Sequence, residues 1–295
     1  MIEELRLISN GSRLSMLPEV DSRINEFEDA IEYCTKNDPE LAIRLASLIW
    51  RYWLYYGHVE RGVDLLEGVT SDSESLDGDY CEALLGLGVL LLKFGRLEDA
   101  EEVLLRLVDI SLERNFTKHY SIARIMISRI EADRGDFLSS KELSDEIAEL
   151  SAKEGDRLTA ALAMHAEAYR NRISGDLEGS VDAYQKGIAM YKEEGAHEME
   201  FEERRNLGTV KFLMGDFYEA SLILQRDDQE WVSGIPYIDA YSNIDKSILA
   251  YIEGKYEESI SLVELAVSSI EDCEQRVDSD EWLLIEHIRG LAGGF

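Results

Sequence analysis

The stretch Gly95-Arg96-Leu97-Glu98-Asp99-Ala100 decides the fold, because its pattern returns along the whole sequence. The matching glycines are Gly57, Gly95, Gly135, Gly175, Gly215 and Gly254, separated by 38, 40, 40, 40 and 39 residues. A constant period of this size is typical of an array of helical hairpins. We therefore predict an all-α fold, a right-handed superhelix of about six hairpins with additional terminal helices.

Each copy of the pattern has positions with a packing role. The glycine ends the first helix of a hairpin, because it tolerates the left-handed backbone of a helix end. Two residues later an apolar side chain, such as Leu97, is expected to fill the hairpin. Three residues further a small residue, such as Ala100, lets the two helices approach. Seven residues before the glycine, five of six copies have a small residue, and Trp50 is the exception. The recurring pattern is therefore scaffold.

The same pattern gives the expected domain organisation. Residues 1–20 are a lead-in segment, and residues 21–295 form a single repeat domain. Hairpins are expected at about 40–75, 80–113, 119–153, 158–195, 199–230 and 238–272, with a cap or half-repeat at 279–292. After Gly215 we expect a shortened helix and a longer loop up to Pro236, because charged residues and turn formers replace small apolar ones. The half-repeat is either a capping helix or the edge of a longer chain.

The charge and composition of the chain exclude some classes of partner and predict its cellular location. The 61 acidic and 30 basic residues give a net charge of −31, which opposes broad contact with a phosphate backbone. We therefore expect no direct nucleic-acid partner. No apolar run is long enough to span a membrane, and the first residues lack the basic start of a signal peptide, so we expect a cytoplasmic protein without a membrane partner. The three cysteines are far apart and are interpreted as reduced core residues.

The sequence carries no recognisable catalytic signature. It has no Walker A loop, no His-Glu-x-x-His and no zinc-type cysteine spacing. Gly86-Leu87-Gly88 resembles part of a dinucleotide loop, but it falls inside an expected helix without a preceding strand and is interpreted as helix packing. We therefore predict a non-enzymatic protein with no catalytic residues, no metal site and no cofactor.

Three stretches near the start carry a resemblance to a known family. They are Phe27-Glu28-Asp29-Ala30-Ile31, residues 40–56, and Gly57-His58-Val59-Glu60-Arg61-Gly62-Val63-Asp64-Leu65-Leu66-Glu67. Together they resemble the opening of the tetratricopeptide (TPR) array in signal-transduction ATPases of the MalT/LuxR-like type, the STAND regulators. Later repeats resemble generic TPR units. The resemblance implies an ATPase and a DNA-binding part elsewhere in the larger family members, neither of which lies in this sequence.

The inner face of such an array is lined by the first helix of each hairpin. Positions ten, six and three residues before each turn glycine give one stripe along that face. The candidate groove residues on it are Arg51, Arg129, His165, Tyr169, Arg172, Arg205, Phe212 and Tyr251. Guanidinium groups pair bidentately with carboxylates, so this row would suit a carboxylate or a peptide. The alternative is that these arginines neutralise acids of the protein itself.

These observations favour a protein-protein or peptide interaction module, or scaffold, in the form of a sensor or regulatory TPR domain. The alternative is the effector-binding segment of a transcriptional or signalling regulator whose ATPase and DNA-binding parts are absent. The expected partner is a protein or peptide in the concave groove. A homodimer through the terminal helices is also possible, because repeat stacks expose apolar ends.

Overall fold

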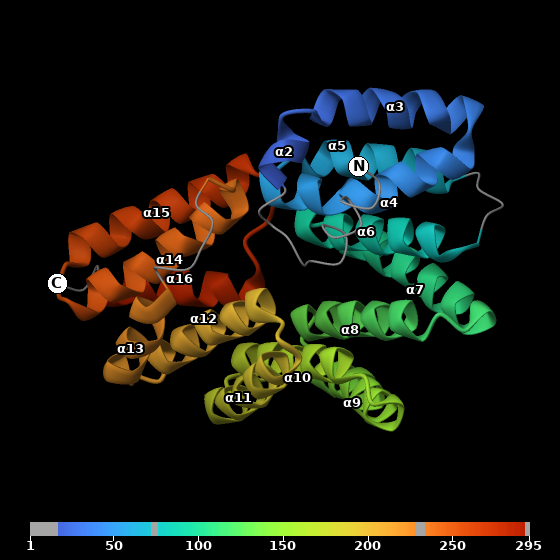
Figure 1. Ribbon diagram of the computed structural model, residues 1–295. Helices are drawn as coiled ribbons and strands as arrows, with labels where there is room; N and C mark the ends of the chain where they lie inside the picture. The colour runs from blue at the N-terminus through green and yellow to red at the C-terminus, as the bar shows by residue number, and fades with distance from the viewer. Residues whose placement is uncertain (1–16, 72–75, 228–233, 293–295) are drawn as a thin grey trace. The chain divides into compact units, whose positions relative to one another are not determined.

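The computed structural model describes residues 17–71, 76–227 and 234–292, and these residues form helices joined by turns, with no strand among them. The first two helices are α2 (Leu17–Asp21) and α3 (Ile24–Asn37). The hairpins are α4 (Pro39–Tyr56) with α5 (Val59–Thr70), α6 (Gly78–Phe94) with α7 (Leu97–Arg114), α8 (Thr117–Asp133) with α9 (Phe137–Glu154), α10 (Arg157–Ser174) with α11 (Leu177–Glu194), α12 (His197–Leu213) with α13 (Phe217–Asp227), and α14 (Pro236–Ile252) with α15 (Tyr256–Asp272). Helix α16 (Ser279–Ala292) follows (Figure 1). The predicted all-α array of helical hairpins is confirmed.

The turn glycines end helices as the pattern predicts. Helix α6 stops at Gly95, whose φ of 92° lies in the left-handed region. The backbone N–H of Arg96 donates to the carbonyl of Leu91 at 2.9 Å, which satisfies one of the free carbonyls at the helix end. The other five turn glycines also have positive φ. Local chemistry at the turn therefore sets where each hairpin bends.

The two helices of a hairpin cross where both carry a small residue. In α10 and α11 the hydroxyl of Ser180 donates to the carbonyl of Ala168 at 2.9 Å. In α14 and α15 the hydroxyl of Ser259 donates to the carbonyl of Ser247 at 2.7 Å. In α8 and α9 the first helix carries the donor instead, because the hydroxyl of Ser128 donates to the carbonyl of Ser140 at 2.8 Å. A hydroxyl bound to the backbone thus holds each of these three crossings together.

Trp50 breaks the small-residue rule without disturbing the packing. Its side chain is 4% exposed and lies against Gly86 of α6, where an added Cβ would come within 2.6 Å of the indole Cγ. Two residues along, a Cβ on Gly88 would lie 2.7 Å from a methyl group of Leu104. Gly86-Leu87-Gly88 is therefore a helix-packing element, as predicted.

The apolar residue two positions after each turn glycine fills its hairpin less often than predicted. Val59 is fully buried, but Phe137 and Phe217 are 37% and 39% exposed. Each of these residues is the first of its helix, so a large ring projects partly past the edge of the hairpin. The ring of Phe217 instead covers Phe212, at a centroid distance of 5.5 Å.

Helix α13 is described over 11 residues, up to Asp227, where this range of described residues ends. The shortened helix predicted after Gly215 stays a prediction. Most of the loop predicted to follow it, residues 228–233, and most of the predicted lead-in, residues 1–16, lie outside the described residues. Among the helices that the structure describes, none combines the length and the apolar character needed to cross a lipid bilayer.

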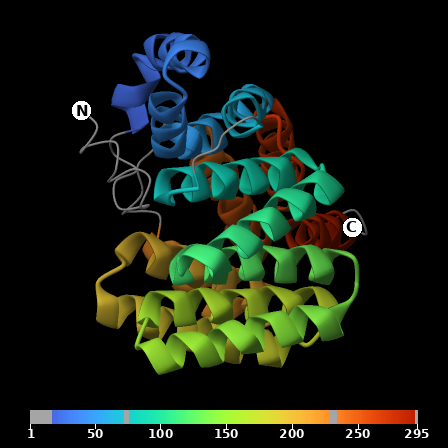
Figure 2. The ribbon, with the colours of Figure 1, turned by 90° about the vertical axis from the view of Figure 1, so that its right-hand side faces the viewer.

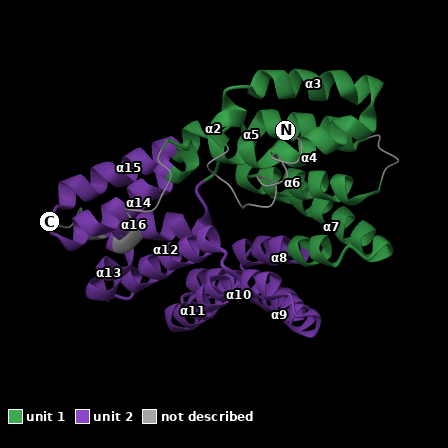
Figure 3. Cartoon of the chain, in the orientation of Figure 1, with its two compact units in different colours: residues 1–123, 234–238, 270–276 green, residues 124–233, 239–269, 277–295 purple. Residues whose placement is uncertain are grey.

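The chain divides into two compact units (Figure 3). Unit 1 comprises residues 1–123, 234–238 and 270–276. Unit 2 comprises residues 124–233, 239–269 and 277–295. Within unit 2, helices α9 to α12 pack in chain order as neighbouring layers (Figures 1 and 2). The single continuous repeat domain expected from the sequence stays a prediction.

In unit 1 the segment 270–276 donates hydrogen bonds to carbonyl groups near the C-terminal ends of α4 and α6. The backbone N–H of Arg276 donates to the carbonyl of Lys93 at 2.8 Å, and the amide of Gln275 donates to the carbonyl of Leu54 at 2.6 Å. Next to them Cys273 packs against the turn at Gly57, where an added Cβ would lie 2.5 Å from the Cα of Cys273. Burial raises the pKa of the Cys273 thiol to about 11. All three cysteines are buried and free, which agrees with the prediction of reduced core residues.

Candidate functional site

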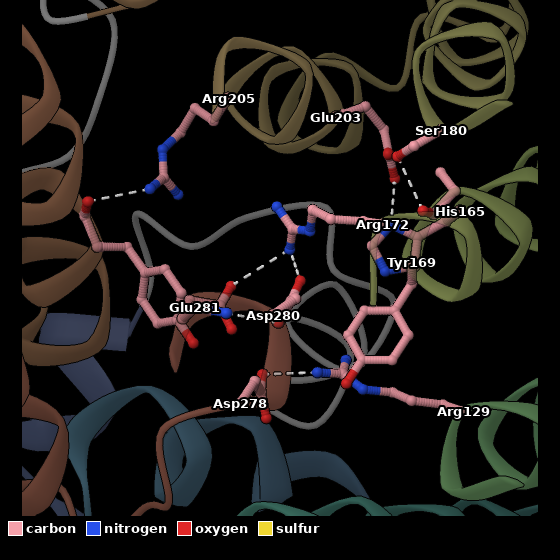
Figure 4. A network of polar contacts seen from close by, with 12 residues as sticks. Arg129, His165, Tyr169, Arg172, Ser180, Glu203, Arg205, Asp278, Asp280 and Glu281 are labelled. Atoms are coloured by element: carbon pink, nitrogen blue, oxygen red, sulfur yellow. Dashed lines mark hydrogen bonds and ion pairs between the residues drawn. The ribbon is translucent and has the colours of Figure 1, made fainter. Parts of the chain in front are cut away.

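The structure places the eight predicted groove residues on the first helices of five hairpins. Seven lie in unit 2: Arg129 on α8, His165, Tyr169 and Arg172 on α10, Arg205 and Phe212 on α12, and Tyr251 on α14. The eighth, Arg51 on α4, lies in unit 1. Figure 4 shows five of the unit 2 residues together with their acidic partners. The candidate site is therefore the α8, α10 and α12 face of unit 2, called the arginine face below.

Arg172 lies at the centre of the arginine face. Its guanidinium forms an ion pair with Asp280, and the side chains are only 3% and 4% exposed. A second acid, Glu281, lies 3.9 Å from the same guanidinium nitrogen. Both acids are in the first turn of α16, where the helix dipole favours negative charge. The first turn of α16 thus delivers two carboxylates to Arg172.

Arg129 receives a third carboxylate from the residue that precedes α16. One nitrogen of its guanidinium lies 2.6 Å from an oxygen of Asp278. The guanidinium also lies over the ring of Tyr169, 4.5 Å from the centroid. Burial alone would lower the pKa of Arg129, but the negative charge of Asp278 outweighs it, so the pKa is raised well above its usual value. Tyr169 in turn donates its hydroxyl to Asp133 of α8.

The three carboxylates Asp278, Asp280 and Glu281 form a tight acidic cluster (Figure 4). Each offers an oxygen, and these oxygens lie within 4.8 Å of one another. Like charges this close repel strongly unless cations lie between them. Arg129 and Arg172 supply that positive charge, so the cluster is explained without a metal ion.

Arg205 is held by the neighbouring hairpin. Its guanidinium pairs bidentately with Asp245 of α14, with an Nη2 to Oδ1 distance of 3.1 Å. The same nitrogen donates to the carbonyl of Tyr241 at 3.0 Å. Burial would lower the pKa of Arg205, but the charge of Asp245 outweighs it and the pKa is raised. A fork-to-fork pair of this kind fixes geometry, so Arg205 ties α12 to α14.

His165 lies beside two buried polar side chains, those of Glu203 and Tyr184. Its Nδ1 is 2.8 Å from a carboxylate oxygen of Glu203 on α12, and its ring meets the edge of Tyr184 at 6.2 Å between centroids. The Tyr184 hydroxyl and the second oxygen of Glu203 are buried without a hydrogen-bond partner. Burial raises the pKa of Tyr184. Neither Glu203 nor Tyr184 stood out in the sequence, since the chain is rich in both acids and tyrosines.

Helix α16 also covers the aromatic end of the stripe. The ring of Phe212 lies 5.4 Å from Tyr251 and 5.8 Å from His287 of α16, between centroids. Helix α16 packs on α10 and α12, with Ile285 and Ile288 fully buried (Figure 1). The stripe predicted as a ligand groove is therefore occupied, within unit 2, by α16 and the acidic residues at its start.

Arg51 of unit 1 takes part in a different arrangement. Its guanidinium lies 3.1 Å from Glu82 of α6, which also accepts from the indole N–H of Trp50 at 2.9 Å. Nε2 of His119 lies 3.4 Å from the other oxygen of Glu82. Burial would raise the pKa of Glu82, but the contact with His119 and the charge of Arg51 outweigh it and lower the pKa to about 2. Glu82 is thus a structural acid that joins α4 to α6.

The alternative interpretation of the arginine stripe therefore holds at all four positions. Arg51, Arg129, Arg172 and Arg205 each pair with an acid of the same protein. The acids themselves were not anticipated, because 61 acidic residues leave no single one conspicuous. Binding of an external partner by these residues stays a prediction.

Comparison with known proteins gives a structural likeness but no sequence match. No protein-family model matches the sequence, and no curated protein sequence matches it. The crystal structure of a tetratricopeptide repeat protein from Parabacteroides merdae ATCC 43184 is similar, with a TM-score of 0.56 and 13% identity over 99% of this chain and 98% of that one. The crystal structure of BtubC (BKLC) from P. vanneervenii is also similar, with a TM-score of 0.51 and 14% identity over 82% of this chain and 92% of that one.

These likenesses show a fold of the TPR type. At 13% and 14% identity they support the fold alone. The predicted TPR-like array is therefore confirmed at the level of fold. The narrower resemblance to MalT/LuxR-like signal-transduction ATPases stays a prediction.

Proposed function

We propose that this protein is a non-enzymatic protein-interaction module whose arginine face binds a carboxylate-bearing segment of a partner protein. One observation carries the proposal: Arg129 and Arg172 already hold three carboxylates, presented by Asp278 and the first turn of α16. A face that binds one acidic segment has the charge and the geometry to bind another.

The repeat architecture supports a binding role. Helical arrays of this type expose an extended surface built from successive helices, and their specificity comes from side chains on that surface. On the arginine face these side chains are guanidinium groups, which recognise carboxylates bidentately. A sensor or regulatory role in the cytoplasm follows if the partner is a signalling protein, and the effector-binding segment of a larger regulator is the second form of the proposal.

Selection from a displayed library of random 16-residue peptides tests the proposal. The bait is the full chain, both as wild type and with Asp278→Asn and Asp280→Asn, which weakens the hold of the internal acids. We expect the enriched peptides to be rich in Asp and Glu and to lose about tenfold in affinity for Arg129→Lys with Arg172→Lys, because lysine keeps the charge but not the fork.

The matched control replaces Arg134 and Arg157, two exposed arginines of unit 2, by lysine. This control should bind the selected peptides as wild type does. If neither bait enriches acidic peptides, or if the enriched peptides bind the Arg129 and Arg172 variant unchanged, the proposed function is wrong.

A further inference from the structure

We infer that Asp278 and helix α16 are an internal ligand of the arginine face, which an acidic, helix-forming segment of a partner protein displaces. The inference rests on the proposed function and adds the kind of partner and the way in which its binding is controlled. The internal ligand, as used below, is residues 278–292.

The first argument is the order of the contacts along the chain. In a helical array each hairpin contacts its immediate neighbours. Helix α16 keeps such a contact with the hairpin before it, because Arg289 pairs with Glu264 of α15 at 2.9 Å. Its acidic start instead reaches Arg129 of α8 and Arg172 of α10, which belong to hairpins much earlier in the chain. These contacts are additional to those that the array itself requires.

The second argument is that the internal ligand satisfies the arginine face incompletely. The Nε atoms of Arg129 and Arg172 are buried without a hydrogen-bond partner, as is one oxygen of Glu281. Buried polar groups are normally satisfied, and leaving them unpaired is unfavourable. A partner that brings a carboxylate or a backbone carbonyl to these donors would be bound more favourably than the internal ligand.

The third argument is energetic. Burying an ion pair removes both charges from water, so the net gain from pairing is small. Exchanging one carboxylate for another on the same arginine therefore changes the free energy little. The advantage of the internal ligand lies instead in its tethering, which gives a short linked segment an effective concentration of about millimolar. A partner must outcompete that concentration, so the internal ligand sets the threshold for binding.

The internal ligand also indicates the form of the partner. Its acids stand at Asp278, Asp280 and Glu281, and the helix that follows buries Leu284, Ile285 and Ile288 to 1% exposure or less. We therefore expect an acidic stretch followed within one turn by a helix with an apolar face. The charge requirement comes from Arg129 and Arg172, and the apolar requirement from the α10 and α12 surface that α16 covers.

Displacement can be tested on the wild-type full chain. The probe is a synthetic peptide of residues 277–292, labelled with ¹³C and ¹⁵N so that its fragments differ in mass from those of the protein. Hydrogen exchange is measured by mass spectrometry as the peptide is added up to millimolar concentration. We expect exchange in residues 279–292 to rise by about tenfold or more while α11 stays protected, because the labelled peptide replaces the internal ligand.

A variant of the internal ligand gives the second measurement. In the full chain with Asp278→Asn and Asp280→Asn, we expect the peptide to bind about tenfold more tightly than in wild type, since the competitor is weakened. The charge-matched control carries Glu257→Gln and Glu258→Gln, two exposed acids of α15, and should bind the peptide as wild type does.

The outcomes separate this inference from the proposed function. Binding that depends on Arg129 and Arg172 but leaves residues 279–292 protected overturns the internal ligand and leaves the proposed function standing. Equal affinity of wild type and the Asp278 and Asp280 variant does the same. Absence of peptide binding to a variant whose α16 exchanges freely overturns both. A dimer seen by light scattering in place of peptide binding would assign the face to a second copy and overturn the partner proposed here.

Discussion

Arg51 and Arg129 occupy the same position of their repeats, six residues before a turn glycine, yet they have different kinds of partner. Arg51 in unit 1 pairs with Glu82, which lies on the first helix of the next hairpin. Arg129 in unit 2 pairs with Asp278, which lies beyond the last hairpin. The first pair joins neighbours in the array, and the second attaches a separate segment to it.

The sequence of the next hairpin accounts for this difference. Glu82 stands thirteen residues before Gly95, and the corresponding residue thirteen before Gly175 is Leu162. Arg129 therefore has no acid at the position that serves Arg51. A repeat position can thus become a binding position when the neighbouring repeat does not supply the complementary charge.

The largest effect is expected when Arg129 is removed. Arg129→Met leaves Asp278 buried without its arginine, and loss of one member of a buried ion pair costs about 3 kcal/mol. We expect α16 to exchange its amide hydrogens roughly a hundredfold faster, since 1.4 kcal/mol is a factor of about ten. Hydrogen exchange with mass detection measures this.

The double variant Arg129→Met with Asp278→Asn is the control, because it removes both charges. It should recover most of the lost protection in α16. Equal exchange in the single and double variants would contradict a direct ion pair and would remove the contrast with Arg51.

A smaller effect is expected from Glu82→Gln in unit 1. The carboxylate accepts charge-assisted bonds, so its loss should destabilise unit 1 by about 2 kcal/mol at pH 7 and leave α16 protected. Because its pKa in the folded protein is about 2, below that of an ordinary glutamate, its stabilisation is present above pH 4.5 and is lost as the pH falls toward 2. Urea unfolding followed through exchange in α4 and α6, from pH 7 to pH 3, should show a flatter acid limb in the variant. A variant with an unchanged pH profile would show that Glu82 is not this acid.

The smallest effect is expected when unit 2 is given the acid that unit 1 has. Leu162→Glu places a carboxylate at the repeat position of Glu82, where it can compete with Asp278 for Arg129. We expect stability to change by less than about 1 kcal/mol, as for most partly exposed positions, and exchange at residues 278–281 to rise a few fold. Leu162→Gln is the neutral control. If both variants behave alike, charge at this position does not distinguish the two units.

The sequence was sufficient for the parts of the fold that depend on local chemistry. The glycine at each turn and the small residue at five of the six crossings were predictable because each follows from a few neighbouring residues. The packing of Gly86 against Trp50 needed the structure, since the tryptophan comes from the preceding hairpin. The exposure of Phe137 also needed it, because the period does not say how far a ring extends past the edge.

The sequence predicted the arginines of the candidate site but not the acids that pair with them. The pattern located the arginines, since they lie on first helices at fixed distances from the turn glycines. Their partners Asp278, Asp280 and Asp245 depend on contacts between distant segments, and nothing in an acidic chain distinguishes them. The cap or half-repeat at 279–292 was predicted from the sequence, but its contact with the arginine face was not.

The hydroxyl at the helix crossings has a consequence for how such a chain can change over time. Ser180 and Ser259 donate to a main-chain carbonyl, an acceptor that every residue possesses, so the opposite residue has only to be small. In the hairpins that contain such a bond, the spacing of the two helices is set within the hairpin and requires no matching change in another hairpin. Units of this kind can be duplicated, lost or substituted one at a time without a compensating change in another unit.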